Sequence, residues 1–341
     1  MGGFAVQGKV VQLYPCVSLT MSLDLDQLTI RSFSLDRDIP LILSLRAATE
    51  AIDQEGTDVS EAALRTQLAL PGHDPSTDRW VVEAPGNPSD LIAYALVYVA
   101  PGADIADTNL IVHPEWRRLG IGSRLVPLIQ ARALQLGATR AQVYGNIKHP
   151  AALGFLHKLG FAPQGIYTEM RLDVEVRLPP IIMPYGYEIR TYAEVQDLTI
   201  LTQAMNLSYI PLWGHHGVSE EQMASWLPEF NQQGLFLVFS EKGRAVGISR
   251  VEPSAERSAK NGAPTGYIDA PGIVPQHRRL DLYRALLLTG IHWLQSRGQT
   301  IIEMESWGDK LEVLKMYREL GFKDMRQLVA YQLELKDRTQ V

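Results

Sequence analysis

The sequence repeats itself at a constant spacing. The segment Pro114-Glu115-Trp116-Arg117-Arg118-Leu119 returns as Pro275-Gln276-His277-Arg278-Arg279-Leu280, an offset of 161 positions. The same offset carries Leu159-Gly160-Phe161 onto Leu320-Gly321-Phe322. Because self-similarity at a fixed spacing is the signature of a repeated folding unit, the chain is expected to contain one fold twice.

The start of each half and the boundary between them follow from the same comparison. Ile30-Arg31 matches Ile189-Arg190, so each half begins with a similar strand. Two prolines in Leu178-Pro179-Pro180 stop any regular element and mark the boundary. The 341 residues also suit two domains. We therefore expect an N-terminal extension over residues 1–20, a first domain over 21–178 and a second over 182–341.

Composition narrows the class of protein. Hydrophobic residues make up 46% and charged residues 21%, as in ordinary globular proteins, and the net charge of −6 does not favour nucleic acid. No apolar run is long enough to span a membrane. Cys16 is the only cysteine, so no intrachain disulfide can form, and a reducing cytoplasm is expected. The segment before Met21 lacks a signal-peptide core, and Met21 is an alternative start.

The periodicity of the first half predicts a mixture of strands and helices. Strands are expected at 28–33, 79–83, 91–99, 108–112 and 140–144, with one or two closing strands over 161–174. Helices are expected at 37–52, 60–70, 119–136 and 150–159, and Gly137 is a suitable residue to end the third of them. The second half repeats this order from Tyr187 to Leu335.

A glycine-bearing turn precedes the long helix of the first half. After Val112 a strand ends, Pro114 makes the turn, and Gly120 and Gly122 open the helix. Glycine has no Cβ, so the backbone can approach a bulky anion at which the first helical amides point. The turn predicts a pyrophosphate cradle, and a helix start with permissive glycines is the simpler alternative. It is not a nucleotide-hydrolase P-loop, because Gly-Lys-Ser/Thr is missing.

This string resembles the acetyl-CoA motif of the GCN5-related N-acetyltransferase (GNAT) family, V-x-P-x-x-R-x-x-G-x-G/A. The fixed positions are filled by Val112, Pro114, Arg117, Gly120 and Gly122, and Leu159-Gly160-Phe161 stands at the family's L-G-F corner. The resemblance covers nearly the whole chain, twice. It implies an α+β fold in each half: a mixed, mostly antiparallel sheet with flanking helices, whose central parallel strands (here 108–112 and 140–144) splay apart.

The resemblance also implies how acetyl-CoA would be held as the acyl donor. The pantetheine would bind the backbone of Leu110, Ile111 and Val112. The pyrophosphate would bind the turn and the helix start, formed by Arg117, Arg118, Leu119, Gly120, Ile121, Gly122 and Ser123. The two arginines would add charge-assisted contacts, or they are solvated surface charges. Asn146 would bind the pantetheine or thioester, or it only forms a turn.

The second half departs from the motif. Asp281 stands at the place of Gly120, and Tyr283 at that of Gly122. A carboxylate repels pyrophosphate and a tyrosine ring would fill its space, so we expect weak or absent CoA binding there. The alternative is that the loop takes another path and still binds.

The proton donor shows the reverse pattern. The family commonly has a tyrosine five residues before the phenylalanine of the L-G-F corner, and it protonates the departing thiolate. Tyr317 fills this position in the second half, whereas the first half has Leu156. A general acid contributes ~10²–10⁴-fold, but positioning two reactants can contribute effective molarities of ~10⁵ M or more. We therefore expect the first half, which keeps the cradle, to be the working site.

Substitute catalytic groups are available in the first half. Tyr144 or His149 could be the acid, although a packed strand aromatic and a helix-start residue are simpler interpretations. By the family pattern, a carboxylate before the cradle would deprotonate the acceptor amine. The candidates are Asp107 and Asp104 in the first half and Asp269, Glu303 and Glu305 in the second, or each is a solvated carboxylate.

The expected reaction is direct acetyl transfer from acetyl-CoA to the amine of a small molecule. In two-domain members of the family one half typically carries the activity. We expect no metal, no nucleic-acid or membrane partner, and a monomer or homodimer. Adjacent His215-His216 do not share a face; they are expected in an aromatic packing loop or, alternatively, at the acceptor. The competing functions are a non-catalytic acyl-CoA sensor and a transferase acting through Tyr317.

Overall fold

The computed structural model describes residues 25–174, 178–210 and 217–336, so the predicted extension, Cys16 and His215-His216 lie outside the described residues. The described chain divides into two compact units. One comprises residues 25–52, 58–96 and 110–129, and the other comprises 53–57, 97–109 and 130–336. Among the described helices, none has the length and apolar character needed to cross a bilayer.

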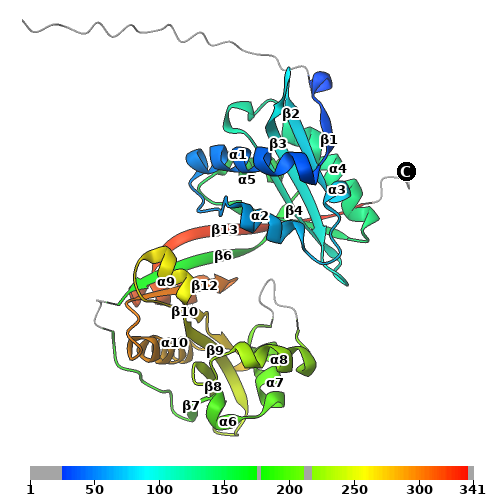
Figure 1. Cartoon of the computed structure of the whole chain (residues 1–341). Helices are drawn as coiled ribbons and strands as arrows, with labels where there is room; N and C mark the ends of the chain where they lie inside the picture. The colour runs from blue at the N-terminus through cyan, green and yellow to red at the C-terminus, as the bar shows by residue number, and fades with distance from the viewer. Residues whose placement is uncertain (1–24, 175–177, 211–216, 337–341) are drawn as a thin grey trace, which may run out of the picture. The chain divides into compact units, whose positions relative to one another are not determined.

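The first unit is an antiparallel sheet covered by helices. Its strands follow the order β1-β2-β3, with bounds Ile30–Ser32, Arg79–Ala84 and Asn87–Val99. Its helices include η1 (Leu25–Gln27), α1 (Leu35–Asp53), α2 (Glu61–Leu68) and α3 (Pro75–Asp78). The apolar residues Ile39, Ile42 and Leu45 recur at helical spacing on one face of α1, which buries them against β2 and β3 (Figure 1).

The second unit contains a long mixed sheet. Its strands follow the order β5-β13-β6-β12-β10-β9-β8-β7. In chain order their bounds are β5 Arg140–Asn146, β6 Ala162–Asp173, β7 Tyr187–Thr191, β8 Leu235–Ser240, β9 Ala245–Pro253, β10 Thr265–Asp269, β12 Ile301–Trp307 and β13 Lys323–Glu334. The short β11 (Gly272–Ile273) pairs with β9 only.

The helices of the second unit include those predicted and one that was not, a short helix between β9 and β10. They are α5 Pro150–Lys158, α6 Tyr192–Val195, α7 Leu198–Ser208, α8 Glu220–Trp226, α9 Ala255–Asn261, α10 Leu280–Gln295 and α11 Leu311–Glu319, with 3-10 turns η3 Leu227–Glu229 and η4 Pro275–His277. The core of this unit is built on α10, where Leu282, Leu286 and Ile291 are fully buried.

The expected splayed strand pair is present in both halves. Strand β4 (Ile105–Val112) pairs with β5 in parallel, and the ladder ends at Asp107 and Gln142 although both strands continue. In the second half β10 pairs with β12 up to Asp269 and Glu305, after which the chain turns to β11 and pairs with β9. The predicted mixed α+β fold, with a parallel central pair that separates, is therefore confirmed.

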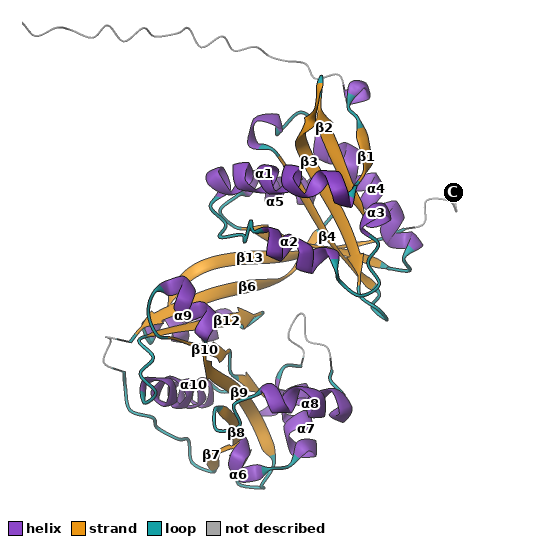
Figure 2. Cartoon of the chain, in the orientation of Figure 1, coloured by secondary structure: helices purple, strands orange, loops and turns teal. Residues whose placement is uncertain are grey.

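The closing strands are exchanged between the halves. Strand β6, which closes the first half in sequence, pairs with β12 of the second half. Strand β13, the last of the chain, pairs with β5 of the first half and with β6 on its other edge (Figure 2). Each half of the repeat thus completes its sheet with a strand from the other, an exchange that the sequence pattern does not predict.

Candidate functional site

The turn after β4 is held in shape by its own side chains. The strand ends where His113 N–H donates to the Ile92 carbonyl at 2.8 Å. The η2 turn (Pro114–Trp116) follows, and Arg117 Nε donates back to the Val112 carbonyl at 3.1 Å. Arg117 therefore closes the turn. This structural role was not predicted from the sequence, which indicated only a contact with the cofactor or a solvated surface charge.

Gly120 begins the helix α4 (Ile121–Gln135) in a conformation that favours glycine. Its φ is +88°, and its carbonyl accepts the first helical bond, from Arg124 N–H at 3.3 Å. A Cβ at this position would come within 2.9 Å of Leu25 Cδ1. Arg118 also has a positive φ, +65°, and is exposed. The helix start thus has the backbone freedom that the motif requires.

The equivalent turn of the second half has the same framework. Its η4 turn is closed by Arg278 Nε, which donates to the Ile273 carbonyl at 2.9 Å. Val274 N–H donates to the Val246 carbonyl at 2.9 Å, as His113 does in the first half. The repeat is therefore preserved in the hydrogen bonds that shape the two turns.

The two helix starts differ in what occupies their first amides. Asp281, which replaces Gly120, accepts the Leu282 N–H at 2.9 Å and pairs with Arg279 Nη2 at 2.6 Å. The carboxylate thereby satisfies a helical amide that an anionic ligand would otherwise bind. Gly120 has no side chain with which to do the same to Ile121.

The tyrosines of the second half lie in its core. Tyr283 and Tyr317 belong to the same buried cluster, and Tyr317 is 0% exposed. The Tyr317 hydroxyl donates to Asp309 Oδ2 at 3.2 Å, and Ser306 Oγ donates to the same oxygen at 2.7 Å. Burial raises the pKa of Tyr283 to about 12 and that of Tyr317 well above its ordinary value. Tyr317 is thus a packed residue with a satisfied hydroxyl.

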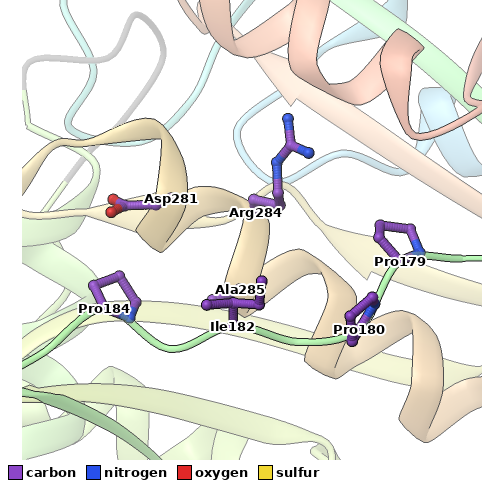
Figure 3. Close-up of a pocket in the computed structure, with 7 residues that line it drawn as sticks. All are labelled: Pro179, Pro180, Ile182, Pro184, Asp281, Arg284 and Ala285. Carbon is purple, nitrogen blue, oxygen red and sulfur yellow. The ribbon is translucent and has the colours of Figure 1, made fainter.

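A shallow hollow of about 250 Å³ lies beside the first turn of α10 (Figure 3). It is lined by linker residues and the helix itself: Pro179, Pro180, Ile182, Pro184, Asp281, Arg284 and Ala285. Arg284 also pairs with Glu319 at 3.6 Å. The lining is mainly apolar, and its one cation, Arg284, is accompanied by the carboxylates of Asp281 and Glu319, so the hollow is poorly suited to a pyrophosphate.

Two of the predicted catalytic residues of the first half share one neighbour. Gln142 Nε2 donates to Asp107 Oδ1 at 3.2 Å and to the Tyr144 hydroxyl at 3.0 Å. Burial, reinforced by the charge of Asp107, raises the pKa of Tyr144 to about 12. The phenol is therefore protonated at neutral pH, and 39% of the residue is exposed. Asp104 is instead paired with Arg140 at 2.9 Å.

His149 and Asn146 lie at the start of α5. His149 Nε2 contacts Glu55 Oε1 at 3.3 Å, and His149 is the residue that precedes the helix. Asn146 Oδ1 accepts the Lys148 N–H at 3.0 Å, as in a turn-forming asparagine. These contacts agree with the simpler interpretation of both residues.

The candidate bases of the second half are all ion-paired. Asp269 pairs with Arg250 at 2.9 Å. Glu303 and Glu305 both pair with Arg257, at 2.7 and 2.8 Å. A carboxylate held by a guanidinium is a weak base, so these residues are poorly placed to deprotonate an amine.

A buried basic cluster in the first unit was not predicted. Arg46, Arg79 and Tyr94 come from α1, β2 and β3 and are almost fully buried. A sequence signal does exist: Arg46 lies on the apolar face of α1, four residues after Ile42. A charged residue on such a face needs a partner, and the hydrophobic periodicity does not indicate which residues provide it.

Two splayed pairs of parallel strands, with a turn and a long helix after β4 and again after β11, define an acyltransferase fold present in two copies. The chain belongs to the acetyltransferase (GNAT) family, whose model matches residues 45–161 and 198–322. It is an N-acetyltransferase that uses acetyl-CoA, and the resemblance expected from the motif is confirmed.

Two relatives match most of the chain. The chain is 30% identical over 259 residues to a mycothiol acetyltransferase of Saccharomonospora viridis, covering 72% of this chain and 80% of that protein. It is 27% identical over 309 residues to the mycothiol acetyltransferase of Rhodococcus jostii, covering 84% and 98%.

Solved structures support the fold. A GCN5-related N-acetyltransferase from Sphaerobacter thermophilus matches with a TM-score of 0.68 at 21% identity, covering 92% of this chain and 97% of that one. A tandem GNAT protein from the clavulanic acid biosynthesis pathway matches with a TM-score of 0.57 at 18% identity, covering 91% and 99%.

Proposed function

We propose that the first half of this chain binds acetyl-CoA at the turn from Val112 to Ser123 and transfers the acetyl group to the amine of a small molecule. The contrast between Gly120 and Asp281 carries this proposal. The first half offers helical amides without a side chain to cap them, whereas Asp281 occupies the amide of Leu282 at 2.9 Å. The relatives named mycothiol acetyltransferase support a small-molecule acceptor.

The residues of the first half fit the parts of acetyl-CoA. The backbone of Leu110–Val112, beyond the end of the parallel ladder, suits the pantetheine, and the positive-φ turn at Gly120 suits the pyrophosphate. Acetyl-CoA supplies an acyl group activated as a thioester. In this proposal Tyr144 supplies a proton to the departing thiolate, and Asp107 accepts the proton of the amine.

A transferase acting through Tyr317 is the second candidate. The match of Tyr317 to the family's acid position favours it, but the buried hydroxyl already donates to Asp309. Capture of Leu282 N–H by Asp281 also weighs against cofactor binding in that half.

Acetyl-CoA titration by calorimetry tests the choice of half. Wild-type protein should bind one equivalent, Gly120→Asp should bind at least tenfold more weakly, and Asp281→Gly should leave affinity unchanged. Gly102→Asp is the matched control, because Gly102 has a φ of +79° with open space around its Cβ position. CoA release from a panel of amines then tests turnover. Loss of activity in Tyr317→Phe with full activity in Gly120→Asp would overturn the proposal.

A further inference from the structure

The buried basic cluster of the first unit holds more positive than negative charge. Arg46 is 6% exposed, Arg79 is 1% exposed and Tyr94 is 0% exposed. The two guanidinium carbons lie 5.9 and 5.8 Å from the centroid of the Tyr94 ring. Two permanent cations therefore flank one phenol inside the protein. Burial raises the pKa of Tyr94, so the phenol stays neutral and adds no negative charge.

Arg79 has a complete set of neighbours. Its Nη1 donates to the Tyr94 hydroxyl, its Nη2 to the Gln67 carbonyl at 2.9 Å, and its Nε to His73 Nε2 at 2.7 Å. His73 Nδ1 in turn lies 3.1 Å from Asp78 Oδ2. Burial, followed by the charge of Arg79, lowers the pKa of His73, so the ring stays neutral. The neutral ring bridges Arg79 and the buried carboxylate of Asp78 and adds no charge of its own.

Arg46 is compensated less completely, by the exposed carboxylate of Asp58 and by no buried carboxylate among its described neighbours. Its Nη2 donates to the uncharged Gln67 Oε1 at 2.7 Å. Within the described part of the chain, its buried Nε and Nη1 have no hydrogen-bond acceptor. Burial is the main cause that lowers the pKa of Arg46, and the charge of Arg79 adds to it, while Tyr94 and Asp58 act in the opposite direction. A buried guanidinium with unused donors is strongly unfavourable unless an anion satisfies it.

The fold does not require these charges. Arg31 lies opposite Val81 on the neighbouring strand, and its repeat equivalent Arg190 lies opposite Leu237. Val81 is therefore equivalent to Leu237, and two residues earlier on each strand Arg79 is equivalent to Leu235 of the second half. Val81 pairs with Tyr94 and Leu237 with Ile248, which aligns Tyr94 with Ile248. Leu235 and Ile248 lie in a buried apolar cluster. The second copy therefore fills the same positions with hydrocarbon.

The position of the cluster is compatible with an acceptor. Tyr94 belongs to the same core as Ile111, a residue of the strand proposed to hold the pantetheine. In Figure 1, α1, which carries Arg46, lies in front of β2 and β3, while α4, which follows the proposed pyrophosphate turn, lies behind them. Gln67 is exposed, so its side chain separates Arg46 from solvent, and its amide oxygen occupies a place that suits a carboxylate oxygen.

We infer that Arg46, supported by Arg79 and Tyr94, binds a carboxylate of the acceptor, so that the substrate class is an amine that also carries a carboxylate. A monoanion is favoured because the buried groups Arg46, Arg79 and Asp78 carry a net charge of only +1, and Asp58 at the surface offsets part of it, so a dianionic phosphate would be overcharged. A guanidinium binds carboxylate oxygens through charge-assisted hydrogen bonds. The inference rests on the proposed function of the first half.

Matched pairs of amines test the inference. Each pair consists of an amino acid and its amide, assayed for CoA release at equal concentration. Wild-type kcat/KM should be at least tenfold higher for the carboxylate member. Arg46→Met should remove this preference, Arg46→Lys should keep part of it, and Arg65→Met, an exposed charge loss on α2, should leave it intact. Equal turnover of both members by the wild-type protein would overturn the inference while leaving the proposed function standing.

A melting experiment gives a second readout that needs no turnover. N-acetylglycine should raise the wild-type melting temperature more than N-acetylglycinamide does, and the difference should vanish in Arg46→Met. Without ligand, Arg46→Met should melt at or above the wild-type temperature, because an unpaired buried charge has been removed. A large drop would mean that Arg46 is a structural residue, and equal stabilisation by inorganic phosphate would mean a non-selective anion site. Either result contradicts the inference, even if no amine is acetylated.

Discussion

Tyr144 and Ala330 lie opposite each other in one antiparallel ladder, although Tyr144 belongs to the first half of the repeat and Ala330 to the last strand of the chain. The neighbouring strand on the other edge of β13 is β6, which also pairs with β12. The halves defined by the repeat are therefore joined through their sheets as well as through the linker at Pro179-Pro180.

The strand exchange predicts that the two halves need each other when the chain is cut. Co-expressed fragments 21–179 and 180–341 should purify together at equal stoichiometry, because each supplies a closing strand that the other lacks. The first fragment alone should be largely insoluble, since its β5 would present an unpaired edge. Size-exclusion chromatography of the fragments checks this. Two soluble, separately folded fragments with no mutual affinity would contradict the exchange.

Much of the fold follows from the sequence because the repeat and the periodicity agree. The helix expected over 119–136 is α4, from Ile121 to Gln135, and the strand expected over 140–144 is β5, from Arg140 to Asn146. The closing strand of the first half is a single strand, Ala162–Asp173, where one or two were expected.

The exchange itself could not be predicted from the pattern. Strands β6 and β13 are repeat-related, so either could complete either half with similar local pairing. Which partner each takes is decided by tertiary structure and not by the local sequence pattern. The division at Leu178–Pro180 remains a prediction about sequence segments.

The candidate site was predictable where a motif fixes the backbone. Gly120 has the positive φ that the motif indicates. The contacts of individual side chains could not be predicted, because short-range geometry decides them. Asn146 accepts a hydrogen bond within its own turn, and Arg117 donates to the Val112 carbonyl. Arg46 escaped notice because a single charge on an apolar helix face hardly changes the periodicity.

Tyr144→Phe should lower kcat about 10²-fold or more if the phenol protonates the thiolate. The fold should be unaffected, because the residue is partly exposed and the ring itself is kept. Because the pKa of Tyr144 is raised to about 12, the wild-type rate should not fall from its ionisation between pH 7 and pH 10.

Tyr317→Phe is the comparison for Tyr144→Phe. It should leave kcat within about twofold and lower the melting temperature, because Asp309 loses a donor in a buried setting; such a loss typically costs about 1 kcal/mol. Steady-state kinetics and thermal melts on the same preparations separate the two effects. A normal melt with lost kcat in Tyr317→Phe would assign catalysis to the second half.

The ion pair between Arg31 and Asp38 should contribute strongly to stability. Arg31 donates two hydrogen bonds of 2.7 Å to the carboxylate of Asp38, whose side chain is fully buried. Arg31→Met should destabilise the protein by about 3 kcal/mol, because it leaves a buried charge unpaired. Arg190→Met, at the equivalent position of the second half, removes an exposed pair with Glu188 and should cost less than about 1 kcal/mol. Urea unfolding of the two variants checks the difference.

The same pair sets a dependence of stability on pH. Burial alone would raise the pKa of Asp38, but hydrogen bonds from Arg31 and Ser34 outweigh it and leave the pKa below its ordinary value. A carboxyl with a lowered folded pKa stabilises the protein above its unfolded pKa, and the stabilisation is lost as the pH falls through the folded pKa. The difference between wild type and Arg31→Met should therefore shrink below about pH 4.

Asp309 should have the opposite effect on how the stability of the protein depends on pH. Burial raises its pKa, against hydrogen bonds from Ser306 and Tyr317 that lower it. A carboxyl with a raised folded pKa stabilises the fold when protonated, and this stability is lost as the pH rises through the folded pKa. Asp309→Asn, which stays neutral and can still accept both bonds, should melt higher than wild type at pH 7 and equally near pH 4. An unchanged or lower melting temperature at pH 7 would show that the charged form is well accommodated.

The pairing of β13 between β5 and β6 has a consequence for how this chain can change over generations. A half that has lost its cofactor turn is not thereby free to decay, because the other half's sheet is unfinished without its final strand. Selection on the first half therefore extends to the framework of the second, whether or not the turn around Asp281 binds a cofactor. Such a copy is retained for the strand that it supplies, independently of any chemistry of its own.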